Sequence, residues 1–173
     1  MDRFTTEKRS EVMSKIRSKN TKLEIYVRHL LFERGFRYRL NRKDLLGQPD
    51  IVLTKWKTVI FVNGCFWHAH QGCKKATIPE TRADFWRQKL DGNRARDQRE
   101  YATLLSMGWR VLVVWQCACL KTRSEALGTL MESFLRSTIS FAEIGRDDVE
   151  GDPSTLTSEE DEVHQHSIEY LIY

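Results

Sequence analysis

Four potential metal ligands lie close together in residues 65–73, whose sequence is CFWHAHQGC. Cys65, His70 and Cys73 supply two sulfurs and one nitrogen, and a fourth ligand follows much later in the chain at Cys117 or Cys119. Three close ligands and one distant cysteine can form a closed tetrahedral zinc site that cross-links two parts of a fold. The alternative is small core cysteines beside a hydrogen-bonded histidine, but the clustering favours structural zinc.

His68 is the potential ligand in this segment that a four-ligand zinc site does not need. A turn at this point would direct its ring away from His70 and toward Asp50. Because an imidazole titrates near neutral pH, His68 is a candidate general base, or a partner of a phosphate or a water molecule. The alternative, about equally supported by the residues, is an imidazole without a chemical role.

Aromatic side chains accompany these ligands. Phe66 and Trp67 lie inside the cysteine-rich segment, and Trp86 follows a basic loop at the start of a long predicted helix. Such rings either cover a metal or insert into a base stack. From the residues alone, packing is the favoured interpretation.

A hairpin is expected to position Asp50 beside this segment. Residues 50–53 and the apolar, β-rich run 58–62 are predicted strands, and residues 55–57 are the predicted turn between them. A regular hairpin places Asp50 beside residues 62–64. A carboxylate and a candidate general base would then lie close together.

The other elements form a scaffold of alternating helices and strands. The predicted helices cover residues 22–34, 81–107 and 124–135, and the remaining predicted strands cover 36–40 and 109–115, the last buried on both faces. Capping boxes are expected at Thr21 with Glu24 and at Thr81 with Asp84. Asp97 falls on the apolar face of its helix, where a buried carboxylate needs a partner.

The charge of the chain is distributed unevenly. Residues 1–144 hold 27 Lys and Arg against 15 Asp and Glu, whereas residues 145–173 hold one Arg against nine acids. The basic body is suited to a polyanion such as nucleic acid, and the basic segment 3–20 is interpreted as a short helix or a mobile arm. The acidic segment is predicted to be a largely disordered tail, so the expected division is a domain at 1–144 and a tail at 145–173.

The compartment follows from what the sequence lacks. No window approaches the roughly 18–20 consecutive apolar residues of a membrane span, and the N-terminus has no apolar signal core. A cytoplasmic protein is therefore expected. In that compartment four cysteines favour metal binding over disulfides.

The order of these motifs resembles the very-short-patch repair (Vsr) endonucleases. The segments that carry the resemblance are GQPD at 47–50, NGCFWHAHQGC at 63–73, TRADFWRQK at 81–89 and WRVLVVWQC at 109–117. The resemblance covers about residues 5–135. It implies an α/β, restriction-endonuclease-like fold, in which a central mixed sheet is flanked by helices and a structural zinc site is present.

The resemblance also implies an activity. Vsr enzymes use magnesium to nick one strand of duplex DNA 5′ to the thymine of a T:G mismatch within a short sequence context. The mismatch arises by deamination of 5-methylcytosine, and the nick initiates repair. The expected partners are double-stranded DNA with a T:G mismatch and other mismatch-repair proteins, with no membrane, and the protein is expected to be a monomer.

Roles for individual residues follow from the matching positions. Asp50 and the main-chain carbonyl of Val62 would hold magnesium, His68 would be the catalytic histidine, and Glu24 would be an acid near the site. The implied zinc ligands are Cys65, His70, Cys73 and Cys117, which leaves Cys119 spare. The implied DNA wedge is Phe66, Trp67 and Trp86, and this reverses the preference for packing.

The sequence departs from the family pattern at two places. Asn63 stands where well-known members carry a second active-site histidine, and an asparagine cannot move a proton near neutral pH. One extra residue lies between His70 and Cys73. Asn63 stays among the expected active-site residues, and His68 is expected to suffice as the acid/base group.

Two other functions are compatible with the same residues. One is a catalytically weak, zinc-stabilised module that binds mismatches, which Asn63 motivates. The other is a restriction-type endonuclease that cuts both strands of perfect sites.

Overall fold

The structure is a computed structural model that describes residues 20–40 and 42–151. The predictions for the basic segment 3–19 and for the acidic segment from residue 152 onward lie outside the described residues. Within the described ranges, no helix is long and apolar enough to cross a membrane.

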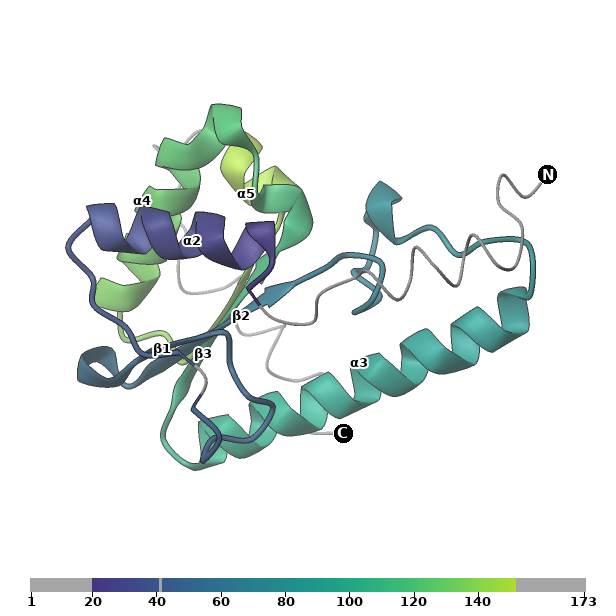
Figure 1. The fold of residues 1–173 in the computed structure, drawn as a ribbon, viewed down its shortest axis with the longest axis horizontal. Coiled ribbons are helices and arrows are strands. Elements are labelled where there is room, and N and C mark those ends of the chain that lie inside the picture. Colours follow the sequence, from purple (N-terminus) through teal and green to yellow (C-terminus); the bar gives the residue numbers. More distant parts are fainter. Residues whose placement is uncertain (1–19, 41, 152–173) are drawn as a thin grey trace.

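A four-stranded mixed sheet forms the centre of the molecule (Figure 1). Its strands are β1 (Ile51–Leu53), β2 (Thr58–Asn63), β3 (Arg110–Trp115) and β4 (Phe141–Ile144), in the spatial order β1-β2-β3-β4. β1 pairs antiparallel with β2, whereas β2, β3 and β4 are parallel. The carboxyl ends of β2 and β3 therefore meet at one edge, where the chain enters the two cysteine-containing segments.

Helices cover both faces of this sheet (Figure 1). Helices α2 (Lys22–Glu33), α4 (Ser124–Arg136) and α5 (Arg146–Glu150) lie on one face, and the long α3 (Ala83–Ser106) lies on the other. Val27, Leu31 and Met131 pack against Ile60 on the first face, and Leu104 packs in the second core cluster. The predicted mixed sheet flanked by helices is confirmed.

The predicted hairpin is present with the expected register. Ile51 lies opposite Ile60, so Asp50 reaches the end of β2. A short 3₁₀ turn at Thr54–Trp56 and Lys57, with φ of 49°, reverses the chain. The remaining 3₁₀ turns are η2 (Lys74–Ala76), η3 (Gln116–Ala118) and η4 (Lys121–Arg123).

Of the two capping boxes predicted from local sequence, one is present and one is not. The predicted box at Thr21 is confirmed, because Thr21 Oγ1 accepts from the Glu24 amide at 3.2 Å and the Thr21 amide donates to Glu24 Oε1 at 3.2 Å. The box predicted at Thr81 is wrong. Helix α3 begins after Arg82, which adopts φ of 57° and gives no side-chain cap.

Three other features differ from expectation. The predicted strand at 36–40 is wrong, since only an isolated bridge forms, between Arg39 and Val52. Strand β4 follows α4 and was not expected. Residues 146–150, predicted to be disordered, form helix α5, with Val149 fully buried in the core.

Candidate active site and metal centre

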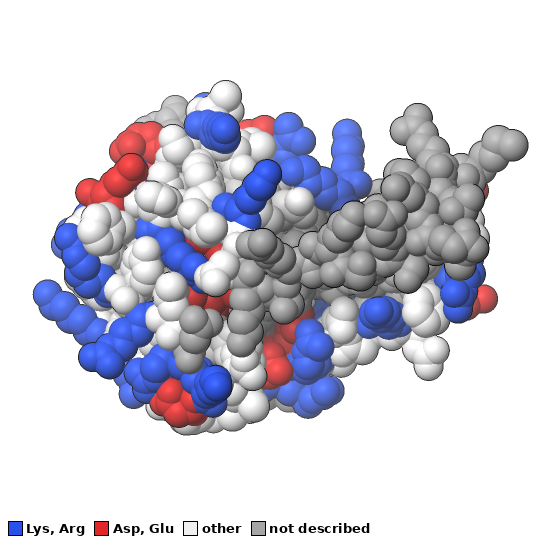
Figure 2. Space-filling view, viewed as in Figure 1, with Lys and Arg blue, Asp and Glu red and all other residues white. Residues whose placement is uncertain are grey.

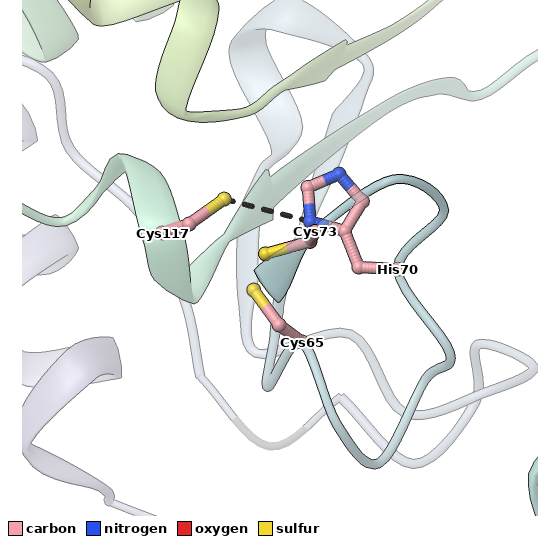
Figure 3. Close-up of side chains that lie close together, drawn as sticks. All are labelled: Cys65, His70, Cys73 and Cys117. Atoms are coloured by element: carbon pink, nitrogen blue, oxygen red, sulfur yellow. Dashed lines mark hydrogen bonds between the residues drawn. The ribbon is translucent and has the colours of Figure 1, made fainter. Parts of the chain in front are cut away.

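The candidate metal centre is assembled from the loop after β2 and the turn after β3, and we refer to it below as the metal centre. The ligand atoms of Cys65, His70, Cys73 and Cys117 all lie within 4.8 Å of one another. Figure 3 shows the three sulfurs and the imidazole converging on one point, with Cys117 entering from η3. His70 presents Nδ1 to this point, 3.5 Å from Cys117 Sγ. Cys119 is not part of the cluster, and its thiol donates to the Trp115 carbonyl at 3.8 Å.

The donor set fits zinc on chemical grounds. Three sulfurs and one imidazole nitrogen are the ligands of a closed tetrahedral structural zinc site. Burial raises the pKa of Cys65 to about 12 and also raises that of Cys117, so the uncharged thiols of these two residues are favoured. A divalent cation at the point of convergence would offset that cost, because metal binding deprotonates its thiol ligands.

A single helical turn separates the roles of His68 and His70. The His68 amide donates to Gly64 O at 3.1 Å, and the His70 amide reaches back to Cys65 O at 2.9 Å. Ala69, at φ of 50°, reverses the chain, and its amide donates to Phe66 O at 3.3 Å. This pair of bonds around a left-handed residue is the pattern that ends a helix. His70 therefore belongs to the metal cluster, whereas the imidazole of His68 hydrogen-bonds to helix α3.

His68 is paired with a carboxylate on α3. Its Nδ1 lies 2.5 Å from Asp97 Oδ2, and Arg96 Nη2 donates to the other oxygen of Asp97 at 3.1 Å. Asp97 is only 7% exposed. The prediction that Asp97 needs a partner is confirmed, and its partner is the candidate general base.

Asp50 is held at the end of β2 by the backbone. Its Oδ2 accepts the Val62 amide at 2.7 Å. Burial raises the pKa of Asp50 to about 6, with the charge of Glu24 acting in the same direction and those of Arg28 and His68 opposing it. Three charged or titratable groups thus act on one buried carboxylate, as is common where a carboxylate binds a cation.

Glu24 contributes a buried charge and is fully engaged in its helix terminus. Its Oε1 accepts from Thr21, and its Oε2 accepts from the Asn20 amide at 2.9 Å and from Arg28 at 2.8 Å. It is 4% exposed. The structure therefore brings Glu24 to the vicinity of Asp50 as a cap residue whose charge acts on that carboxylate.

Asn63 is buried at the end of β2 and bonded to a tyrosine. Its Nδ2 donates to the hydroxyl of Tyr101 at 2.8 Å, and the side chain is 4% exposed. Burial raises the pKa of Tyr101. Asn63 and His68 line a common cleft of about 570 Å³.

The three aromatic residues form one cluster at the start of α3. The ring centroids of Phe66 and Trp67 are 5.2 Å apart, and those of Phe66 and Trp86 are 5.4 Å apart. Lys89 Nζ lies 5.8 Å from both tryptophan rings. Asn93 Nδ2 donates to Trp67 O at 2.9 Å, which joins the loop to the helix. All three rings are half-buried.

Basic side chains surround these sites. Figure 2 shows Lys and Arg spread over much of one face of the molecule. At the aromatic cluster, Arg82 lies 4.7 Å from the ring of Phe85, which is 44% exposed. This arrangement suits contact with a phosphate backbone beside exposed rings.

Sequence reasoning did not find three contributors to the site. Asp97 was marked as a buried acid but was not assigned to His68, and Tyr101 was on the same helical face without an assigned role. Their spacing of four residues predicts that they share one face of α3. No local sequence pattern indicates that this face contacts β2 and its loop. Asp148, near His70, was hidden in a segment predicted to be disordered.

The fold and the site together define a restriction-endonuclease-like α/β protein with a cysteine and histidine cluster that could hold a metal ion. The family model described as "DNA mismatch endonuclease Vsr" matches residues 1–75. The protein is 53% identical over 116 residues to the type II nicking enzyme V.XorIIP of Xanthomonas oryzae pv. oryzae, a match that covers 67% of this chain and 85% of that protein.

Two further relatives agree with this match. The type II nicking enzyme V.NmeAIP of Neisseria meningitidis serogroup A is 53% identical, over 67% of this chain and 82% of the relative. The DNA mismatch endonuclease Vsr of Escherichia coli K12 is 37% identical over 139 residues, which is 79% of this chain and 88% of the relative. The chain belongs to the Vsr family of DNA mismatch endonucleases, and it is a DNA endonuclease.

Proposed function

We propose that this protein nicks one strand of duplex DNA 5′ to the thymine of a T:G mismatch in a short sequence context. The nick would initiate very-short-patch repair of deaminated 5-methylcytosine. The observation that carries this proposal is the aromatic cluster of Phe66, Trp67 and Trp86 beside the His68 site. We further propose that the enzyme acts as a monomer in the cytoplasm.

The rings provide a physical basis for mismatch selectivity. Inserting an aromatic wedge between base pairs costs a few kcal/mol of unstacking, and this cost is least at a mismatch. Lys89 and Arg82 beside the rings would hold the backbone on either side of the opened step. Two of the relatives are type II nicking enzymes, which supports cleavage of one strand.

The cleavage step would use residues on β2, its loop and α3. Asp50 and the main-chain carbonyl of Val62 would hold magnesium, which prefers oxygen ligands. When bound, magnesium supplies charge neutralisation at the phosphate oxygens and stabilises the leaving 3′ oxygen. Cys65, His70, Cys73 and Cys117 would hold zinc as a structural cross-link.

His68 would move the proton in this reaction. Because its Nδ1 lies 2.5 Å from a carboxylate of Asp97, the proton is held at Nδ1 and Nε2 is left to accept a proton from the attacking water. Asp97 also stabilises the imidazolium that forms, as carboxylates do in other catalytic pairs. Glu24 would act through its charge on Asp50. Asn63 would contribute a hydrogen bond and no proton transfer.

A nicking assay tests the proposal. Duplexes that differ only in T:G against T:A, with each strand labelled in turn, are incubated with magnesium and resolved under denaturing conditions. The expected result is one nick 5′ to the mismatched thymine, lost in Asp50→Ala and kept in Asp91→Ala, an exposed acid on α3. Equal cleavage of both duplexes, or breaks in both strands, would contradict the proposal.

A second variant tests the wedge separately. Trp67→Ala should reduce the preference for T:G over T:A by about tenfold or more, since aromatic stacking contributes roughly 1–3 kcal/mol per base. The control is Phe32→Ala, an exposed ring on α2 that contacts Arg37. Unchanged selectivity in Trp67→Ala would assign the rings to packing.

One observation favours a second candidate, a mismatch-binding module with weak cleavage. Asn63 replaces a proton-transferring side chain and is bonded to Tyr101. This candidate predicts tight T:G binding without product over long single-turnover incubations, and product in Asn63→His. Efficient nicking by the native protein would exclude it.

A further inference from the structure

We propose that Asp148, in the first turn of the acidic segment, is a positioning residue of the metal centre that accepts the proton of His70 Nε2 through one bridging water. This inference rests on the proposed zinc site. It assigns the beginning of the acidic segment to the metal centre.

Helix α5 is anchored at the place where Asp148 would act. Val149 is fully buried in the core formed with α2 and α4. The Gly145 amide donates to Asp148 Oδ2 at 2.6 Å, which fixes the carboxylate over the beginning of the helix. The same helix contacts η3, the turn that carries Cys117, and Arg146 lines one cleft with Cys117.

The outer edge of His70 faces this turn. A Cβ atom added to Gly145 would lie 3.6 Å from His70 Nε2 and 3.6 Å from Asp148 Oδ2, so the ring and the carboxylate flank the same small space. Trp115 stacks on the imidazole with a centroid distance of 4.0 Å and an interplanar angle of 3°, which holds the ring plane.

The chemistry of a histidine ligand requires an acceptor at this position. Nδ1 of His70 faces Cys117, so Nδ1 is the nitrogen that would bind metal. A neutral imidazole that binds through Nδ1 carries its proton on Nε2. Carboxylates that accept this proton orient the ring and raise its basicity, and their loss typically reduces metal affinity 10- to 100-fold.

Nearby cations offset the charge of an added carboxylate. Three thiolates, a neutral imidazole and a divalent ion carry a net negative charge, which a further acid would oppose. Lys74, Lys75 and Arg146 line the cleft of about 600 Å³ that also contains His70 and Asp148. Glu143 and Asp147 line the same cleft, so its three cations face three carboxylates, of which Asp148 flanks His70.

The test measures zinc affinity of the full-length protein without DNA. Zinc dissociation constants come from competition with a chromogenic chelator, and cobalt-substituted protein reports the ligand geometry through its visible spectrum. Asp148→Asn keeps the cap, because its amide oxygen still accepts the Gly145 amide, and it removes the negative charge of the oxygen that faces His70. We expect this variant to bind zinc 10- to 100-fold more weakly and to show an altered cobalt spectrum.

The matched control is Asp147→Asn, which removes the same charge from the same turn. It should bind zinc within threefold of the native protein, and Asp148→Glu should recover part of the affinity. If Asp148→Asn fails to fold, Asp148→Ser is measured instead, since serine caps the helix without reaching His70.

Four results would overturn the inference. The first is an Asp148→Asn protein that binds zinc as tightly as the native protein, and the second is equal weakening of zinc binding in the Asp147 and Asp148 variants. The third is an Asp148→Glu protein that recovers no zinc affinity, and the fourth is a native protein that binds no zinc. The proposed nicking activity is measured separately on DNA. Loss of mismatch nicking with the expected affinity pattern would overturn the proposed function and leave this inference standing.

Discussion

Two carboxylates near the candidate active site have different surroundings. Asp50 accepts one backbone amide, and burial raises its pKa to about 6. Asp97 is paired with both His68 and Arg96. A carboxylate that is costly to ionise without a cation suits metal binding, whereas a paired carboxylate suits the orientation of an imidazole. Two variants separate these roles.

Asp97→Asn should leave DNA binding intact and slow nicking. An asparagine amide can donate to Nδ1, which would favour the proton on Nε2 and prevent His68 from accepting one. The corresponding change in the serine protease triad lowers kcat about 10⁴-fold, and we expect a loss of at least about 100-fold here. Single-turnover nicking and DNA affinity are measured together, with Asp91→Asn as the control. A rate within twofold of the native rate would remove Asp97 from the mechanism.

Asp50→Asn should stabilise the protein when magnesium is absent. The pKa of Asp50 rises from 3.8 to about 6 on folding, so between these values the folded state binds more protons than the unfolded state. Stability therefore falls as pH rises through this window, and the cost is fully present above it. About two pKa units correspond to roughly 3 kcal/mol at pH 7. Chemical denaturation at pH 4 and pH 7 checks the difference.

Magnesium should reverse the order of stability. The native protein gains stability from an ion that binds only the folded state, and the variant does not. Without magnesium, the difference in unfolding free energy between the native protein and Asp50→Asn should change between pH 4 and pH 7. The same difference at both pH values would contradict the burial of this carboxylate.

At the scale of elements, the turn from Gly64 to His70 joins the metal centre to the candidate catalytic residue. Cys65 and His70 are in the metal cluster, and His68 lies between them. Ala69 adopts a left-handed conformation that costs a residue with a Cβ about 1–2 kcal/mol. The turn persists because two backbone hydrogen bonds and the candidate metal ligands Cys65 and His70 stabilise it.

Ala69→Gly should therefore stabilise the zinc-loaded protein. Relief of the left-handed conformation exceeds the added entropy of a glycine in the unfolded chain, and the expected net gain is about 0.5–1 kcal/mol. Ala126→Gly, inside α4, is the control and should destabilise by about 1 kcal/mol. Thermal unfolding measures both variants, and destabilisation by Ala69→Gly would show that the turn differs from this description.

The sequence predicted those elements whose pattern is local. The capping box at Thr21 and the hairpin register at Asp50 were confirmed because neighbouring residues determine them. The strand predicted at 36–40 was wrong, since alternation alone cannot show that only Arg39 reaches a partner strand. The cap predicted at Thr81 was wrong because Arg82 adopts a left-handed conformation that no propensity indicates.

At the scale of the whole molecule, composition gave a wrong prediction for a segment whose structure depends on tertiary contacts. The segment after Gly145 is acidic, yet Val149 fills a position in the core and Asp148 reaches the surroundings of His70. In the same way, the pairs His68 with Asp97 and Asn63 with Tyr101 join β2 and its loop to α3. The cysteine cluster could be predicted from the spacing of its ligands, because they follow the ends of two adjacent parallel strands.

This placement makes the metal centre a link between distant parts of the chain, and Cys117 tests that link. Cys117→Ser should release zinc and lower the free energy of unfolding by at least about 3 kcal/mol, since zinc binding supplies folding free energy. For a chain of this length that corresponds to a fall of about 10 °C in melting temperature. Cys119→Ser is the matched control, because this thiol lies outside the cluster and bonds only to the Trp115 carbonyl among the described residues.

Loss of zinc in Cys117→Ser should disturb the active site through the turn at Ala69. The apolar contacts of Ile60, Leu112 and Met131 do not depend on the metal, so the sheet should keep its hydrogen-exchange protection in Cys117→Ser. Residues 64–76 should lose theirs, and nicking should fall with them because His68 is no longer held against Asp97. Metal analysis, exchange and nicking are measured on one preparation. Equal behaviour of the Cys117 and Cys119 variants would show that the cysteine cluster holds no metal and that the turn is stable on its own.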